Sequence, residues 1–228
     1  MNDKTTTLAL VLILAVHIAA GIFWIVKDKR PPFVEDSAKH ALDGLRVLPD
    51  TGDWTLGMVE SQERHLDAYP PVHRALLGAA YMLMGATLNV AQLLSLLVFL
   101  GVLFATYLIA QTVLAGNRSA ALIATIIAGC FPAVLVSSRA SNLSMSLALA
   151  VCLTVLSLIK CDGFRNIRWS VLLGVFLGLG MLVKWSFLVF VVAPIAFTAV
   201  KALRQREILR RIVNAAAVSY THLTLPTN

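Results

Sequence analysis

Charge is scarce in this chain. Only 14% of its 228 residues are charged, against about 25% in ordinary soluble domains, which excludes an ordinary soluble enzyme. Cysteine is scarce too: the three cysteines show no CxxC or CxxH spacing, so the sequence offers no zinc motif and we expect free thiols. A disordered chain is excluded because 58% of the residues are hydrophobic, more apolar surface than a chain can leave in water.

The hydrophobic residues are gathered into long runs separated by short polar segments. Most of these runs have about the length that a bilayer requires of a helix, roughly 20 residues. The runs cover residues 8–26, 72–88, 90–114, 119–136, 143–159, 169–183 and 185–200. The predicted fold class is therefore all-α, a polytopic transmembrane bundle.

The basic residues predict how these runs cross the membrane. Lys and Arg number 19 against 12 Asp and Glu. Basic residues accumulate in cytoplasmic loops, and no basic stretch carries a nucleic-acid reader motif, so we expect no nucleic-acid partner. If 72–88 re-enters the membrane or lies at its surface, Arg139, Lys184 and the long polar segment 27–71 fall outside. The inside set is then Arg118, Lys160, Arg165, Arg168 and the cluster at 201–211. We predict about six spanning helices plus one juxtamembrane or re-entrant helix.

The polar segment 27–71 is the expected first external loop, and it carries candidate catalytic residues. After Asp36 the apolar residues recur at helical spacing, which predicts an amphipathic helix along the membrane surface. The exposed N–H groups at a helix start keep a carboxylate such as Asp36 ionised, and an ionised carboxylate can take a proton from an attacking hydroxyl. Glu35 offers the same group, and His40 is a candidate for binding the substrate. Alternatively, Asp36 only caps the helix and His40 is an ordinary solvated side chain.

Two more positions bring polar groups next to apolar runs. Tyr69 and His73 flank a Pro-Pro pair, which fixes the backbone at a helix start and places both side chains at the membrane interface; the alternative is a rigid helix start and nothing more. Lys184 interrupts the apolar residues from 169 to 200, where a charge is costly and is usually placed for a ligand. It could instead extend toward water from a helix end. Arg139 is interpreted in the same way.

Taken in order, these motifs resemble those of the membrane glycosyltransferases of the protein O-mannosyltransferase and aminoarabinose-transferase type (glycosyltransferase family 39), which have the GT-C fold. That family has an acidic residue after the first helix, a Pro-Pro pair opening a helix, an arginine in an external loop and a Gly-Leu-Gly-x-Leu-x-Lys stretch. The matching residues here are Glu35-Asp36, Tyr69 to His73, Ser138 to Asn142, and Gly178 to Lys184. The resemblance covers most of residues 8–205.

The resemblance implies an enzyme that takes a sugar from a polyprenyl-phosphate donor at the extracytoplasmic face of a bacterial plasma membrane. The acceptor would be a glycan, a lipid or a protein. Asp36 or Glu35 would be the acidic catalytic residue, and Lys184 and Arg139 would face the lipid phosphate. Tyr69 and His73 would line the site. No metal ligand or further cofactor is assigned, and Asn142, where the family often has an acid, leaves metal dependence open.

The end of the sequence follows none of these patterns. Residues 218–228 resemble the translation of a sequencing adapter, so we expect them to be a non-native tail. Residues 1–217 would then be the N-terminal part of the GT-C-like domain, with the natural chain continuing beyond Ala217 and the given piece itself incomplete as an enzyme.

Two other function classes fit a membrane bundle. A transporter or flippase for a lipid-linked or anionic substrate would carry its critical charges in mid-bilayer and show inverted repeats, and no such symmetry is visible in the sequence. A structural membrane subunit would make Asp36 and Lys184 incidental.

Overall fold

The computed structural model describes residues 2–28, 40, 42, 44–45 and 70–203, and this part of the chain is helical, without strands. Its main helices are α1 (Asp3–Lys27), α4 (Val72–Met84), α5 (Leu88–Val113), α6 (Arg118–Cys130), α7 (Pro132–Arg139), α8 (Leu143–Lys160), α9 (Ile167–Met181) and α10 (Phe187–Leu203). The predicted all-α class is confirmed.

Polar caps fix where several of these helices begin. The side-chain oxygens of Thr87 and Asn142 accept first-turn backbone N–H groups of α5 and α8, at 3.4 and 3.1 Å. Asn117 and Asn166 do the same for α6 and α9. The first N–H groups of a helix have no partner within it, so a cap at each start supplies a hydrogen bond that would otherwise be missing.

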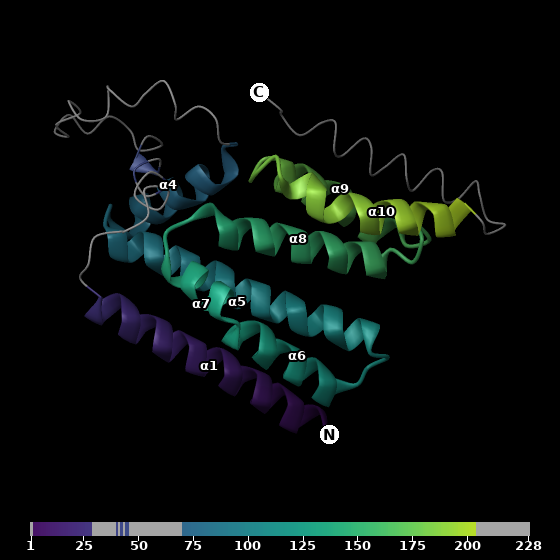
Figure 1. The fold of residues 1–228 in the computed structure, drawn as a ribbon, viewed down its shortest axis with the longest axis horizontal. Helices are drawn as coiled ribbons and strands as arrows, with labels where there is room; N and C mark the ends of the chain where they lie inside the picture. The colour runs from purple at the N-terminus through teal and green to yellow at the C-terminus, as the bar shows by residue number, and fades with distance from the viewer. Residues whose placement is uncertain (1, 29–39, 41, 43, 46–69, 204–228) are drawn as a thin grey trace.

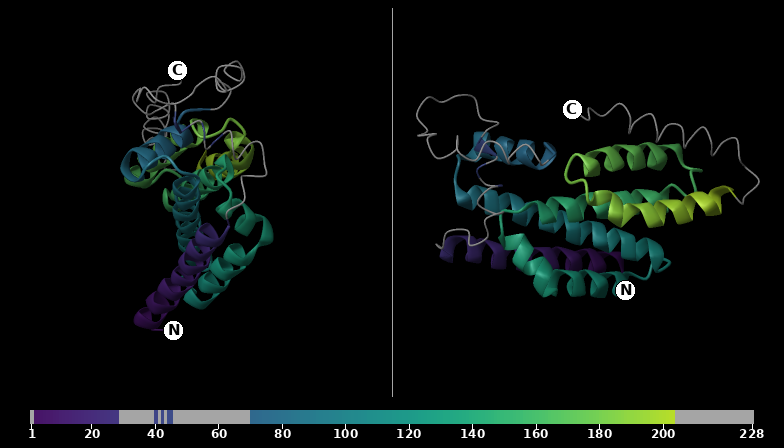
Figure 2. Two further views of the ribbon diagram at one scale, coloured as in Figure 1. Left: turned by 90° about the vertical axis from the view of Figure 1, so that its left-hand side faces the viewer. Right: turned by 45° about the horizontal axis from the view of Figure 1, so that its top comes forward.

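The helices α5 and α8 form the centre of the bundle (Figure 1). The helices α1, α6 and α7 lie on one side of this pair, and α9 and α10 lie on the other, as the two further views in Figure 2 also show. Phe99 and Leu103 of α5 are almost fully buried and pack with Met145 of α8. On the other side of α8, Leu173 of α9 and Phe187 of α10 belong to a second buried cluster.

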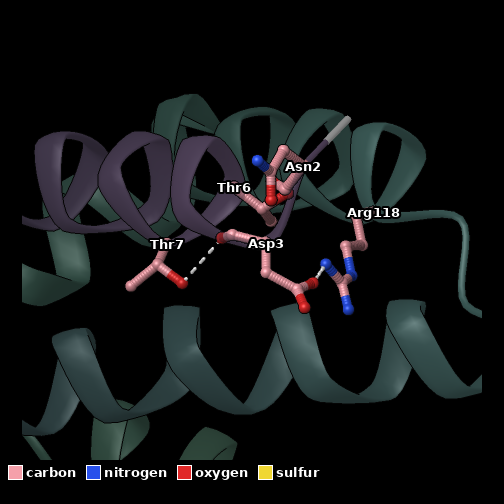
Figure 3. Close-up of polar contacts among 5 residues, drawn as sticks. All are labelled: Asn2, Asp3, Thr6, Thr7 and Arg118. Carbon is pink, nitrogen blue, oxygen red and sulfur yellow. Dashed lines mark hydrogen bonds and ion pairs between the residues drawn. The ribbon is translucent and has the colours of Figure 1, made fainter.

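The first helix is joined to α6 at the end where both begin. Asp3 of α1 forms an ion pair with Arg118 of α6, and the Thr7 hydroxyl donates to the Asp3 carbonyl oxygen at 3.0 Å (Figure 3). One turn further along, Leu10 packs against Ala121 in a small buried cluster. The helices α1 and α6 therefore start at the same end of the bundle.

The run predicted at 119–136 is broken into two helices. The helices α6 and α7 are bent by 62° where they meet, and the break lies at Phe131, directly before Pro132. Proline lacks an N–H group and pushes the preceding residue out of helical geometry, so the chain turns there.

Helix length limits the number of membrane spans. Three helices, α1, α5 and α8, are long and apolar enough to cross a membrane, and the bent pair α6–α7 raises the number to four if it counts as one span. The 15 residues of α9 extend only about 22 Å, against a hydrocarbon core of about 30 Å. In the described part of the chain, fewer than the expected six helices are therefore long enough to span a membrane, because α9 and the 17-residue α10 are short.

The helix α4 is also too short to cross a bilayer. It has 13 residues, about 20 Å of helix, and it ends earlier than the expected 72–88 because Gly85 adopts φ 89°, a conformation that glycine tolerates and that terminates helices. Its buried residues Leu77 and Tyr81 pack on Val90 and Ala91 at the start of α5. The helix therefore covers one end of the bundle (Figure 1), in agreement with a juxtamembrane or re-entrant element.

The described charges divide between the two ends of the bundle. We call the "α4 end" the end formed by α4, the last turn of α1, the starts of α5 and α8 and the turn between α9 and α10. It carries Lys27, Arg74, Arg139 and Lys184. The opposite end carries Lys4, Arg118, Lys160, Arg165, Arg168 and Lys201. Arg139 and Lys184 thus lie at the end away from Arg118, Lys160, Arg165 and Arg168, in the two groups that the charge pattern predicted, and Lys27 and Arg74 lie at their end.

Candidate functional site

The start of α4 is fixed to the turn between α9 and α10. The Val72 backbone N–H donates to the Leu182 carbonyl oxygen at 3.1 Å. Val72 is the first residue of α4, and the first N–H groups of a helix have no hydrogen-bond partner within the helix. Pro71 precedes it as the N-cap residue. This bond holds His73, the next residue of α4, beside the turn that carries Lys184.

The turn between α9 and α10 depends on a glycine. The Gly180 carbonyl oxygen accepts from the backbone N–H groups of Val183 and Lys184, both at 3.1 Å. A Cβ atom at Gly180 would lie 2.4 Å from ring carbons of the fully buried Phe187, a distance that real Cβ atoms do not reach. The glycine lets the Phe187 ring close over the end of α9, and this packing sets the position of the half-buried Lys184.

Two buried histidines lie together at the start of α4. His40 and His73 are each 4% exposed, and their ring centroids are 5.8 Å apart with an interplanar angle of 81°. His73 Nδ1 lies 2.9 Å from the Ser146 hydroxyl oxygen on α8. The loop residue Gly44 lies so close to α4 that a Cβ there would meet Leu77 and Tyr81. The three side chains His40, His73 and Ser146 form a buried polar group that we call the "histidine cluster".

Arg139 occupies a different part of the α4 end. Its guanidinium carbon lies 4.5 Å above the Trp24 ring of α1, an attractive cation–π arrangement. Both residues line a cavity of about 20 Å³ between α1, α5 and α7, together with His17 and Ser138. That volume holds about one water molecule, so this cavity is too small for a sugar. Arg139 therefore lies against α1, whereas Lys184 lies beside the start of α4.

The outcome for the predicted site residues is mixed. Glu35, Asp36 and Tyr69 lie outside the described residues, so their roles stay predictions. His40 and His73 are brought together. The interpretation of His40 as an ordinary solvated side chain is wrong, because its ring is buried against α4.

The sequence interpretation missed Ser146 as a member of this cluster. No local signal could have identified it, because a serine in an apolar helix usually bonds to its own backbone. The sequence also gave no direct indication that Trp24 contacts Arg139. It indicated only that Trp24 is an aromatic residue at the expected membrane interface, where tryptophan is enriched.

The described residues do not provide a set of metal ligands. Within these ranges there is no group of three or more His, Cys, Asp or Glu side chains that could hold a metal ion. Asn142, the residue that stands where the resembling family often has an acid, caps α8 by accepting from the Ser144 N–H. Metal dependence stays open, since Glu35 and Asp36 are outside the described part.

Comparison with known proteins gives one finding. A family model described as dolichyl-phosphate-mannose-protein mannosyltransferase matches residues 68–227. No curated protein and no solved structure gives a significant match. The matched segment includes His73, Arg139 and Lys184 and begins after Glu35 and Asp36.

Proposed function

Because the chain belongs to the dolichyl-phosphate-mannose-protein mannosyltransferase family, a family of membrane glycosyltransferases of the GT-C type, we propose that its sugar donor is a polyprenyl-phosphate sugar. The transfer takes place at the extracytoplasmic face of a bacterial plasma membrane, and the α4 end is the end that faces outward. The acceptor is a glycan, a lipid or a protein.

The arrangement of the α4 end supports this proposal most directly. The Val72–Leu182 bond brings the histidine cluster next to the turn that bears Lys184, and Arg139 lies at the same end. The donor's phosphate is an anion, and a lysine or an arginine can neutralise charge on it. Among the described residues, the opposite end carries the larger group of basic residues, which is typical of a cytoplasmic face.

The proposed reaction is a single displacement with inversion. An oxygen of the acceptor hydroxyl attacks the anomeric carbon of the sugar, and its proton passes to the carboxylate of Asp36 or Glu35. The bond between the anomeric carbon and the phosphate oxygen breaks, and polyprenyl phosphate leaves with the bonding electrons. Lys184 and Arg139 stabilise the negative charge that grows on this leaving group. Tyr69, His40 and His73 line the site.

The test uses membranes that contain the protein expressed from its natural full-length gene. Transfer of labelled sugar from a polyprenyl-phosphate donor is measured for the wild type, Asp36→Asn and Glu35→Gln. Loss of a general base should lower kcat by about 10²–10⁴-fold in one of the two variants. The matched control is Asp162→Asn, which removes a 76% exposed carboxylate at the opposite end and should leave transfer unchanged.

The other outcomes are equally informative. Full transfer in both variants would overturn the assignment of the catalytic carboxylate. An absence of transfer from every polyprenyl-phosphate donor tested, together with movement of the donor across the bilayer, would favour the transporter instead.

A further inference from the structure

The turn between α8 and α9 lies at the opposite end of the bundle from α4 (Figure 1) and carries three basic side chains between positions 160 and 168. Lys160 is the last residue of α8, Arg165 lies in the turn, and Arg168 lies in the first turn of α9. The two arginines are exposed and the lysine is half-buried. We call these three residues the "basic turn".

Hydrogen bonds and one buried ring fix the backbone of the basic turn. The Cys161 carbonyl oxygen accepts from the backbone N–H groups of Arg165 and Asn166, at 2.9 and 3.1 Å. The Asn166 side chain in turn accepts from the Arg168 N–H at 3.2 Å. Phe164 has φ 67°, which is uncommon for a bulky residue, and its ring is buried in the cluster between α8, α9 and α10. Both arginines therefore project from a fixed backbone.

The positive charge of the basic turn is only partly balanced by neighbouring carboxylates. Asp162 pairs with Arg165 at 3.8 Å, with side chains 76% and 47% exposed, and exposed pairs of this kind contribute little to stability. Among the described residues, no carboxylate forms an ion pair with Arg168 or Lys160. The first turn of α9 has no acidic residue, although the dipole of a helix repels cations at its start. An anion beside the basic turn would compensate this charge.

Apolar surface adjoins these charges at the expected membrane boundary. The Lys160 ammonium lies 5.1 Å from the centroid of the Trp169 ring, a cation–π distance, and tryptophan is enriched where membrane and water meet. Ile167 is 46% exposed beside them in the sequence. Because α8 is long and apolar enough to cross a membrane, its last residue, Lys160, is placed at the membrane surface. A ligand that fits this place is anionic and carries apolar chains.

We propose that the basic turn binds the headgroup of an anionic phospholipid in the leaflet that this end of the bundle faces. The two guanidinium groups donate to phosphate oxygens, whose geometry matches the planar fork of arginine, and Lys160 adds a third positive charge. The acyl chains lie along the apolar surface at Ile167 and Trp169. Basic pockets between transmembrane helices bind such headgroups in other proteins. The inference is independent of sugar transfer, because the basic turn lies at the end opposite the proposed reaction.

Trp169 can report this binding directly, because bromine atoms on lipid acyl chains quench the fluorescence of a nearby tryptophan. The chain has four tryptophans, so Trp24, Trp54 and Trp185 are replaced by phenylalanine in the full chain, which is kept in a neutral detergent. Brominated phosphatidylglycerol is titrated in, and brominated phosphatidylcholine, which has no net charge, is the comparison. We expect the anionic lipid to bind more tightly, and its binding to weaken with rising salt because ions screen the attraction.

Removing both arginines should abolish most of this preference. In Arg165→Gln/Arg168→Gln the dissociation constant for brominated phosphatidylglycerol should rise by about 30-fold, because each basic residue beside an anionic surface contributes about 1 kcal/mol and about 1.4 kcal/mol is a factor of ten. The matched control Lys4→Gln/Lys27→Gln removes the same charge from exposed positions on α1 and should leave the constant unchanged. Equal quenching by brominated phosphatidylcholine in the parent chain and both variants verifies that the surroundings of Trp169 are intact.

Three outcomes would overturn the proposal. The first is equal affinity for the two lipids in the parent chain, or unchanged affinity for the anionic lipid in the arginine variant. The second is an equal loss of affinity in the control, which would show that net charge alone attracts the lipid. The third is displacement of the lipid by an equal concentration of inorganic phosphate, which would mean that the basic turn takes a free anion. None of these results bears on sugar transfer, which is measured separately.

Discussion

At the scale of single residues, Lys184 and Arg139 are the two cations proposed to face the phosphate, and they have different supports. The Lys184 backbone N–H donates to the Gly180 carbonyl oxygen, so the turn between α9 and α10 fixes the position of Lys184 through its backbone. Arg139 is supported through its side chain by the Trp24 ring. A lysine is a compact point charge and an arginine a planar fork, so the two groups would contribute to phosphate binding in different ways.

Replacing Lys184 by glutamine should slow sugar transfer by about 10²–10³-fold in kcat, the cost of removing one group that stabilises developing negative charge. The measurement is initial-rate kinetics on purified full-length protein with the lipid-linked donor varied. Lys201→Gln removes an exposed lysine from the opposite end and should have no effect. A Lys184→Gln enzyme with wild-type kcat would mean that the lysine only extends toward water from its turn.

At the scale of elements, the boundaries of the long apolar helices could be predicted well. The run 90–114 became α5 (Leu88–Val113) and the run 143–159 became α8 (Leu143–Lys160), because a polar residue stands at each start and apolar content defines the rest. The break between α6 and α7 was missed although Pro132 was visible, since proline within an apolar run can either kink a helix or open a new one. Only packing decides between them.

The contact between α9 and α10 gives a prediction at this scale. Gly180→Ala should destabilise the fold by about 1–3 kcal/mol, the usual cost of overpacking, because the new Cβ would lie 2.4 Å from the Phe187 ring. The thermal midpoint of the detergent-solubilised protein measures this, and Phe187→Leu in the same chain should recover part of the loss.

Gly101→Ala is the control for that substitution. The nearest atom to a Cβ there is the flexible end of Leu149, at 3.2 Å, so a small side-chain movement accommodates the methyl group and the midpoint should change little. Equal losses for Gly180→Ala and Gly101→Ala would show that the close approach of Phe187 is not what limits the turn.

At the scale of the whole molecule, the separation of charges between the two ends predicts the membrane orientation. Single cysteines are introduced at Trp185, which is 72% exposed in the turn beside Lys184, and at Asp162 at the opposite end. The reagent is a membrane-impermeant maleimide. The reagent is added to cells whose outer membrane has been permeabilised and whose plasma membrane is intact. We expect Trp185→Cys to react under these conditions. Asp162→Cys should react only after the plasma membrane is also permeabilised.

The native cysteines permit this experiment. Cys161 is fully buried, and its burial raises the pKa of the Cys161 thiol, so the reactive thiolate is rare at neutral pH and the group should stay unlabelled. Cys130 and Cys152 are replaced by alanine in the background. Labelling of both introduced cysteines from the same side would contradict the arrangement of the two ends, and the reversed pattern would place the α4 end in the cytoplasm.

The candidate site was less predictable from the sequence than the bundle. Pro70, Pro71 and Lys184 were visible because proline and an isolated charge stand out in apolar surroundings. The burial of His40 and the contact between His73 and Ser146 depend on segments that meet only in the folded chain, and helical periodicity carries no information on such meetings. For the same reason, the separation of Arg139 from the start of α4 could not be predicted.

The Val72–Leu182 bond also sets the order in which the α4 end is completed during synthesis. A ribosome adds about 5–20 residues per second, so Ser146 is made roughly 4–15 s after His73, and Leu182 is made later still. Until that residue emerges, the first turn of α4 lacks its partner and Lys184 has not been made. The turn that carries Lys184 and the first turn of α4 are therefore completed together, after α5 to α9 have been made.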